Sequence, residues 1–193
     1  MTERRRLHRY TYADYTALEM WSPGKHEFLD GEIYAMAGGS EEHSALSAEM
    51  VRVLGNAVGD RPCRVHTSDL RIYVEEVGLA TFPDASVICG PLQQHDPSPS
   101  STALNPAILV EVTSDSSEGY DTGPKLDYYQ TISSLREYVI VSHRERRITV
   151  HLRTAADAWT TRVAIRGGRV EVPSLGADLV VDEIDPNLKP PRR

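Results

Sequence analysis

Apolar residues recur along the chain with two different periods, which together predict a mixed α/β fold. Between residues 46 and 58 they follow the three-to-four-residue spacing of a helix packed on a sheet. Residues 107–113 are almost all apolar and rich in β-branched side chains, as is typical of a central strand buried on both faces. Further extended segments are predicted at residues 64–66, 70–74, 82–89, 137–142 and 147–152.

Capping and turn residues predict where several elements begin and end. The spacing of Thr11 and Asp14 predicts a capping box at the start of a short helix that reaches about Met20. Asp30-Gly31 predicts a tight hairpin between residues 25–29 and 32–37 near the N-terminus. Gly167-Gly168 predicts a second hairpin, between residues 160–165 and 169–172.

The length of 193 residues is sufficient for one domain with a substantial core. We expect a single domain with its core at about residues 10–184 and flexible tails. The proline- and serine-rich stretch at residues 90–105 predicts a mobile surface loop. No apolar stretch approaches the ~20 residues that span a bilayer, and no apolar segment follows the N-terminal arginines, so a cytoplasmic protein is expected.

The formal charge of -7 argues against a protein that coats nucleic acid non-specifically, because that affinity comes from clustered lysine and arginine. It leaves room for a local basic rim, for which the sequence offers three short clusters: Arg4-Arg5-Arg6, Arg144 with Arg146-Arg147, and Arg166 with Arg169. The only cysteines, Cys63 and Cys89, lack the spacing of a zinc site. We expect both to be buried free thiols.

Glu111 interrupts the apolar strand at residues 107–113, and this is the main chemical anomaly of the chain. Period-two alternation places it on the same face as Leu109 and Thr113. A lone buried carboxylate costs several kcal/mol, so Glu111 must be paired with a cationic side chain, bound to a metal cation, or protonated. Asp84 follows Pro83, and since proline belongs at the start of a strand, Asp84 is expected near a strand end.

Lys125 lies one loop after this strand, in the first turn of a helix that Asp121 is expected to cap. Its ammonium group could reach back over the strand end, and Tyr129 lies one turn further along the same helix face. His43 continues the apolar stripe of the earlier helix and is a candidate partner of an acidic residue. Asp69 is a candidate structural residue that holds a strand end through backbone donors.

The order of these residues resembles a restriction-endonuclease family abundant in cyanobacteria, which belongs to the PD-(D/E)XK nuclease superfamily. The resemblance covers about residues 10–184. It rests on Glu27 with Leu29-Asp30-Gly31-Glu32-Ile33, His43, Ser68-Asp69-Leu70-Arg71, Pro83-Asp84, Val110-Glu111-Val112-Thr113-Ser114-Asp115-Ser116, Tyr120-Asp121, and Lys125 with Tyr128-Tyr129.

The resemblance implies a central mixed β-sheet flanked by helices, to which the two turn motifs add β-hairpins near both termini. It implies a site where Asp84 and Glu111, with Glu27 as a further ligand, bind Mg²⁺ or Mn²⁺. The superfamily's usual lysine lies two residues after the second acid, where this chain has Thr113, so Lys125 is the candidate catalytic lysine. A DNA substrate and a homodimer are also implied.

Elementary electrostatics supports a cation at such a site. Two carboxylates about 4 Å apart repel by roughly 4 kcal/mol at an effective dielectric constant near 20. Oxygen ligands of this kind suit Mg²⁺ or Mn²⁺. The function we expect is a metal-dependent endonuclease that hydrolyses DNA, with RNA as another substrate to test. The alternative is a catalytically inactive nuclease-fold module that binds nucleic acid or protein.

Overall fold

A computed structural model describes residues 9–95, 102–155 and 158–184 of the chain. The expected flexible tails, the Arg4-Arg5-Arg6 cluster and the middle of the loop at residues 90–105 lie outside these ranges. No helix in the described ranges is long and apolar enough to cross a membrane.

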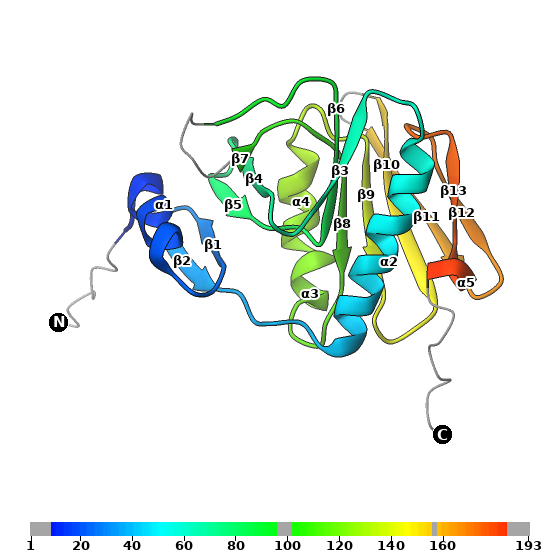
Figure 1. Ribbon diagram of the computed structural model, residues 1–193, viewed down its shortest axis with the longest axis horizontal. Coiled ribbons are helices and arrows are strands. Elements are labelled where there is room, and N and C mark those ends of the chain that lie inside the picture. Colours follow the sequence, from blue (N-terminus) through cyan, green and yellow to red (C-terminus); the bar gives the residue numbers. More distant parts are fainter. Residues whose placement is uncertain (1–8, 96–101, 156–157, 185–193) are drawn as a thin grey trace.

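Two β-sheets lie side by side and form the frame of the molecule (Figure 1). The larger sheet contains, in spatial order, β11 (Ala158–Ile165), β10 (Arg147–Ala155), β9 (Glu137–Val141), β8 (Pro106–Val112), β6 (Ala85–Cys89) and β3 (Cys63–Thr67). The other contains β2 (Glu32–Ala35), β1 (His26–Leu29), β5 (Leu79–Thr81), β4 (Arg71–Val74) and β7 (Thr102–Ala103). The larger sheet is mixed, because β8 runs parallel to β9 and antiparallel to β6.

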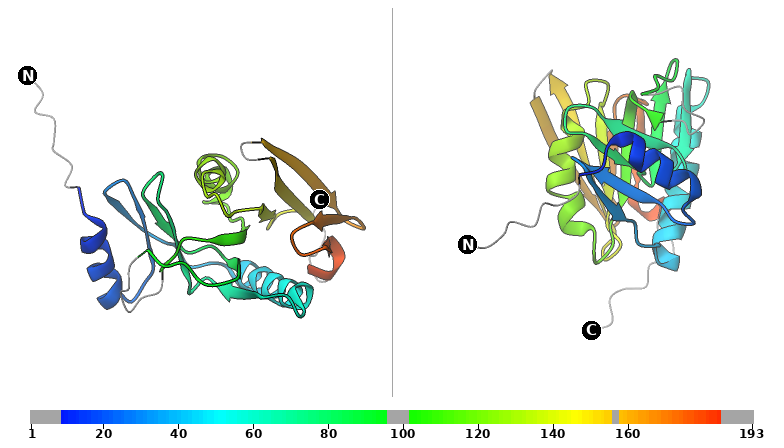
Figure 2. Two further views of the ribbon diagram at one scale, coloured as in Figure 1. Left: turned by 90° about the horizontal axis from the view of Figure 1, so that it is seen from above. Right: turned by 90° about the vertical axis from the view of Figure 1, so that its left-hand side faces the viewer.

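Helices cover both faces of the larger sheet. Figure 2 shows α2 (Glu41–Val58) on one face, and α3 (Glu118–Asp121) with α4 (Pro124–Gln130) on the other. Helix α1 (Tyr12–Trp21) packs against the smaller sheet, where Tyr15 stacks on Phe28. The short helix α5 (Val181–Ile184) follows a two-stranded pair of β12 (Arg169–Val172) and β13 (Ala177–Val180). The expected α/β fold with a central mixed sheet flanked by helices is therefore confirmed.

Strand β8 divides the core in the way its alternation predicts. Ile108, Val110 and Val112 belong to the apolar cluster that includes α2, whereas Leu109 belongs to the cluster that includes Tyr129 of α4. Glu111 shares the face of Leu109 and is 5% exposed. The strand thus carries a buried carboxylate toward the side on which α3 and α4 lie.

The local signals of the N-terminal half are confirmed. The Thr11 side chain and Asp14 form the capping box of α1. Asp30 and Gly31 both have positive φ angles, 44° and 89°, as the tight turn between β1 and β2 requires. The hydroxyl of Ser40 accepts a hydrogen bond from the backbone of His43 and caps α2.

Two predictions for the second half were wrong in detail. Strand β12 pairs with β13 and not with β11, so the C-terminal hairpin is β12–β13. The turn at Gly167-Gly168 forms, but the chain leaves the large sheet at this point. A turn motif in the sequence does not indicate whether the next strand stays in the same sheet. Asp121 does not cap the helix that carries Lys125, because it lies inside α3, and α4 begins after Gly123 with Pro124 in its first turn.

The prediction of two free thiols was also wrong, because Cys63 and Cys89 form a disulfide. The register of β3 and β6 places the two cysteines directly opposite each other, with their Cα atoms 4.0 Å apart. The residues are 26 positions apart in the sequence, so their proximity depends on how two distant strands pair.

Candidate functional site

Lys125 joins acidic residues from three separate elements. Its ammonium nitrogen lies 2.9 Å from Glu111 Oε1 of β8 and 3.0 Å from Glu27 Oε1 of β1. A third carboxylate, Asp121 of α3, is 3.7 Å away. The side chains of these four residues are at least 87% buried. The structure therefore brings the lysine of α4 together with Glu111 and Glu27, and we call these four residues the lysine–acid cluster.

Neutral hydroxyl groups complete the cluster. The Tyr129 hydroxyl, one helical turn after Lys125, donates a 2.7 Å hydrogen bond to Glu111 Oε1. The Thr81 hydroxyl of β5 donates to Glu27 Oε1. One oxygen of each glutamate thus receives two polar partners, which offsets much of the cost of burying the carboxylates.

Asp84 lies immediately before β6 and is held by the neighbouring strand. The backbone N–H of Val112 donates a 2.7 Å hydrogen bond to Asp84 Oδ2, and the same oxygen lies 3.3 Å from His43 Nε2 of α2. Asp84, Glu111 and Lys125 all line one open cleft of about 790 Å³. The three residues singled out in the sequence therefore face a common cavity.

Burial and charge shift the pKa values in this region. Burial raises the pKa of Glu111 to about 8, even though Lys125 acts in the opposite direction. Burial also raises the pKa of Asp121. Burial alone would lower the pKa of Lys125, but the carboxylates of Glu111, Glu27 and Asp121 together raise it. One cation is thus surrounded by more acids than it can neutralise, and the ammonium group keeps its proton.

The His43 imidazole is affected by its acidic neighbour. Its hydrogen bond to Asp84 raises its pKa above the ordinary value for histidine. The sequence expectation that His43 partners an acidic residue agrees with this contact.

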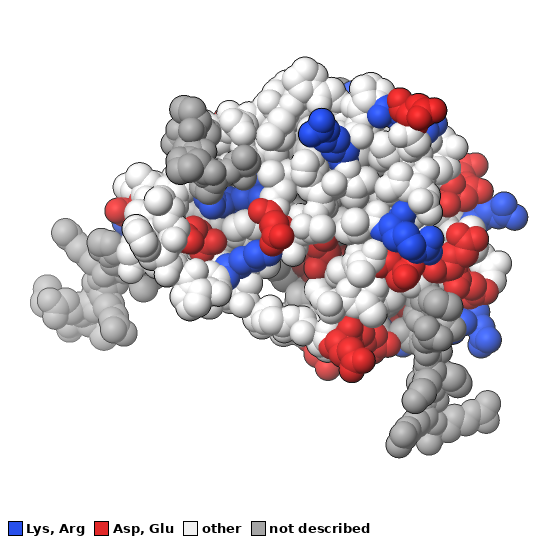
Figure 3. Space-filling view, viewed as in Figure 1, with Lys and Arg blue, Asp and Glu red and all other residues white. Residues whose placement is uncertain are grey.

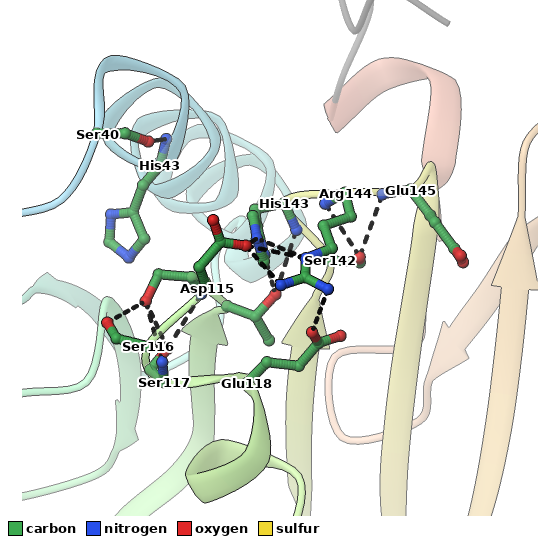
Figure 4. Close-up of polar contacts among 12 residues, drawn as sticks. Ser40, His43, Asp115, Ser116, Ser117, Glu118, Ser142, His143, Arg144 and Glu145 are labelled. Carbon is green, nitrogen blue, oxygen red and sulfur yellow. Dashed lines mark hydrogen bonds and ion pairs between the residues drawn. The ribbon is translucent and has the colours of Figure 1, made fainter. Parts of the chain in front are cut away.

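A second polar group lines the cleft beyond the C-terminal ends of β8 and β9 (Figure 4). The His143 ring lies 2.8 Å from Thr113 Oγ1 through Nδ1, and 3.0 Å from Asp115 Oδ1 through Nε2. Arg144 Nη2 also contacts Asp115 Oδ1, at 2.5 Å. Thr113 occupies the position of the superfamily's usual lysine. Its hydroxyl contacts His143, which follows the end of the neighbouring strand β9.

Sequence reasoning did not place Asp121 or His143 in the site. Asp121 precedes Lys125 by four residues but belongs to the separate helix α3, so its approach to Lys125 depends on how α3 and α4 join. His143 follows β9, which is parallel to β8, and the carboxyl ends of parallel strands meet at one edge. That signal requires knowledge that these two strands are neighbours.

Asp69 does not join the lysine–acid cluster. It lies in the turn that carries the chain from β3 in one sheet to β4 in the other. Its exposed carboxylate accepts a 2.8 Å hydrogen bond from Lys25 Nζ, so its partner is a side chain and not the backbone donors that we expected.

The donor atoms of the cleft are suited to a hard cation. Within the described ranges no group of three histidine, cysteine, aspartate or glutamate residues could hold a metal ion. Mg²⁺ needs only one or two carboxylates, because water and substrate phosphate supply its other ligands. In the part of the chain that the structure describes, Asp84 Oδ1 and Glu111 Oε2 accept no hydrogen bond, and both residues line the cleft. This pair of acids fits such an ion, and Glu27, which contacts Lys125 and Thr81 through Oε1 alone, lines the same cleft.

Comparison with known proteins shows the family of the chain. The Uma2 family, described as "Putative restriction endonuclease", matches residues 12–182. The chain belongs to this family. Two relatives from Synechocystis sp., both described as uncharacterized proteins, are 34% and 32% identical over 160 and 149 residues. These matches cover 83% of each chain for the first relative, and 77% of this chain and 84% of the relative for the second.

A solved structure shares the fold of this Uma2 family member. The crystal structure of a protein from Anabaena variabilis, described as a "putative nuclease belonging to DUF820", superposes with a TM-score of 0.67 at 20% sequence identity. The match covers 84% of this chain and 90% of the other. At that identity the likeness supports the fold alone.

Proposed function

We propose that this protein is a metal-dependent endonuclease that hydrolyses DNA phosphodiester bonds in the cleft between its two sheets. The observation that carries the proposal is that Asp84, Glu111 and Lys125 line one cleft in a member of a restriction-endonuclease family. Two acids that can share a hard cation, with an ammonium group beside them, suit the negative charge that develops on a phosphate during hydrolysis.

Asp84 and Glu111 are the residues that would hold Mg²⁺ or Mn²⁺. When bound, such an ion supplies Lewis-acid polarisation of the phosphate and makes the attacking water more acidic. The Val112 N–H fixes Asp84, and the Tyr129 hydroxyl fixes Glu111, so both acids are oriented before an ion arrives. Glu27, which the resemblance makes a further ligand, holds Lys125 in this structure.

Lys125 contributes a fixed positive charge. Burial among three carboxylates keeps its ammonium group protonated and aimed at the cleft. In the proposed reaction this group stabilises the additional negative charge of the phosphate in the transition state. Thr113 cannot supply that charge, and no step is assigned to it.

The test is cleavage of supercoiled plasmid DNA and of single-stranded circular DNA with Mg²⁺ or Mn²⁺, measured for the native protein and for Asp84→Asn, Glu111→Gln and Lys125→Met. We expect each substitution to reduce the cleavage rate at least about a hundredfold, as expected when a group that stabilises transition-state charge is lost. The matched control is Glu137→Gln, because Glu137 is also a buried acid of the large sheet but bonds to Ser174 away from the cleft. This variant should cleave at the native rate.

Equal cleavage by all variants would exclude the assigned residues. No cleavage by the native protein, together with only weak Mn²⁺ binding in titration calorimetry, would instead favour the inactive nuclease-fold module. A matched RNA substrate in the same assay decides whether the sugar matters. The expected homodimer stays a prediction, and sedimentation of the native protein would test it.

A further inference from the structure

An exposed aromatic ring lies directly beside the lysine–acid cluster. Tyr34 of β2 stands opposite Glu27 in the register of the N-terminal hairpin. Residues that face each other across antiparallel strands share one face of the sheet, with Cβ atoms about 5 Å apart. Tyr34 is 48% exposed and lines the same cleft as Asp84 and Lys125. A large apolar surface is thus open to the cavity next to the proposed reaction centre.

The Tyr34 side chain has a hydrogen-bond partner on its own strand. Its hydroxyl donates a hydrogen bond to the carboxylate of Glu32, two positions earlier on the same face of β2. An aromatic ring held in this way offers its flat face for stacking at a low entropic cost.

Hydroxyl groups line another part of the cleft. Figure 1 places β2 on one side, and the first turns of α2 together with α3 on the other. Ser40, Ser44 and Ser47 come from the start of α2, and Ser116 and Ser117 from the loop before α3; Figure 4 shows Ser40 with His43, and Ser116 and Ser117 in that loop. Serine hydroxyls commonly hydrogen-bond phosphate oxygens of nucleic acids.

The net charge of the protein favours a nucleic acid with a low density of phosphate charge. The net charge is -7, and the face drawn in Figure 3 shows scattered Lys and Arg among its described residues without a continuous basic band. Lys25, at the cleft, is already paired with Asp69. A duplex carries a phosphate charge for about every 1.7 Å of its axis, roughly twice the density of one strand. The cleft volume of about 790 Å³ is of the size that holds small molecules, roughly 300–1,000 Å³, and so accommodates a few unpaired nucleotides.

We propose that the cleft takes a single unpaired nucleic-acid strand, with Tyr34 stacking on the base next to the phosphate at the lysine–acid cluster. The serine hydroxyls on the other side contact the sugar-phosphate backbone of that strand. This inference rests on the proposed function, since it names the form of nucleic acid that the site receives.

The experiment is fluorescence anisotropy with a labelled oligothymidylate, its duplex with oligoadenylate, and an oligouridylate, with Ca²⁺ present to limit cleavage. The native protein should bind the single strands more tightly than the duplex. Tyr34→Ala should weaken single-strand binding about tenfold, because base–aromatic stacking is lost. Tyr34→Phe keeps the ring and loses only the hydroxyl bonded to Glu32, so it should bind single strands more tightly than Tyr34→Ala. The affinities for oligothymidylate and oligouridylate show whether the protein prefers DNA or RNA.

The matched control is Trp21→Ala, which removes an aromatic ring that is 86% exposed but does not line the cleft. Its binding should be unchanged, and circular dichroism should show that every variant is folded. Tighter binding of the duplex, or native binding by Tyr34→Ala, would overturn the inference even if plasmid cleavage succeeds. Tyr34-dependent binding without any cleavage would leave the inference standing and remove the proposed function.

Discussion

Glu111 and Lys125 carry charge into a part of the molecule that is otherwise apolar. Burial alone disfavours both charges, and each is tolerated because the other lies 2.9 Å away and Tyr129 donates a further hydrogen bond. Burial is the main cause that raises the pKa of Glu111 to about 8, and the nearby carboxylates of Asp121 and Asp84 add to it because the acids outnumber the ammonium group. Two predictions about single residues follow from this imbalance.

The first concerns the pH dependence of stability. The pKa of Glu111 rises from 4.5 in the unfolded chain to about 8 in the folded protein. Between these values the folded state binds more protons, so the free energy of unfolding should fall as pH rises, by at most about 1.4 kcal/mol per pH unit. Urea unfolding at pH 5 to 8 with EDTA should show this slope in the native protein and a shallower one in Glu111→Gln. Parallel slopes would mean that Glu111 is charged in both states.

The second concerns the buried cation. Lys125→Met keeps the volume but leaves Glu27, Glu111 and Asp121 without their positive partner, so we expect a loss of about 3–5 kcal/mol in the free energy of unfolding at pH 8. Lys25→Met is the control, since the Lys25–Asp69 pair is exposed and should contribute less than about 1 kcal/mol. Urea unfolding of both variants measures the difference. Similar losses in the two would contradict the importance of the buried pair.

Individual helices and strands deliver the site residues to one place. Strand β8 presents Glu111 on one face, α4 presents Lys125 and Tyr129 one turn apart, and the start of α2 holds His43 against Asp84. The disulfide joins β3 to β6, the strand that Asp84 precedes. The positions of the acids therefore depend on local backbone geometry at element ends.

Gly39 provides a test of this geometry before α2. A Cβ atom at Gly39 would lie 2.5 Å from His43 Nδ1, whereas one at Gly38 would meet nothing within 4 Å. Gly39→Ala should therefore push the imidazole away from Asp84 and lower the pKa of His43, because the bond to Asp84 is what raises it. Gly38→Ala should leave it unchanged. An NMR titration of the histidine resonances would reveal either result, and equal pKa values in the two variants would contradict the expected displacement.

The disulfide between β3 and β6 should contribute to stability by restricting the unfolded chain. Its cysteines are 26 residues apart, for which loop entropy predicts a stabilisation of about 3.5 kcal/mol. We expect the double variant Cys63→Ala, Cys89→Ala to unfold at lower urea concentration than the native protein. Dithiothreitol should lower the native midpoint and leave that of the variant unchanged. An insensitive native midpoint would indicate that the strand pairing alone holds this edge.

At the scale of the whole molecule, the chain passes repeatedly between the two sheets. It leaves the smaller sheet after β2, runs through α2 to β3 of the larger sheet, and returns to the smaller sheet for β4 and β5. It then enters the larger sheet for β6, the smaller for β7, and the larger again for β8. The cleft lies where Glu27 of one sheet meets Glu111 of the other through Lys125. Neither sheet can separate from the other without breaking this cluster.

This connectivity predicts one cooperative unit, in keeping with the expected single domain. Native-state amide hydrogen exchange should give equal opening free energies for buried strands of the two sheets, represented by Ile72 of β4 and Val110 of β8. The exposed edge strand β2 serves as a control for local opening and should exchange faster. Markedly weaker protection of Ile72 than of Val110 would show that the smaller sheet opens by itself.

The sequence by itself determined the elements that depend on neighbouring residues. The Thr11 capping box, the Asp30-Gly31 turn and the alternation around Glu111 each act over a few positions, so they could be read directly. The resemblance to a nuclease family then indicated Asp84 and Lys125 as candidates, because their order along the chain matches a family motif.

Only the tertiary structure decided which distant residues meet. The pairing of β3 with β6 joins two cysteines, the partner of β12 is β13, and Glu27 and Asp121 gather around Lys125. These contacts link residues of different strands and helices, and their free energy depends on the sheet order and on burial, which no local pattern contains. The acids could be named from the sequence, but the fold decided that the lysine lies between them.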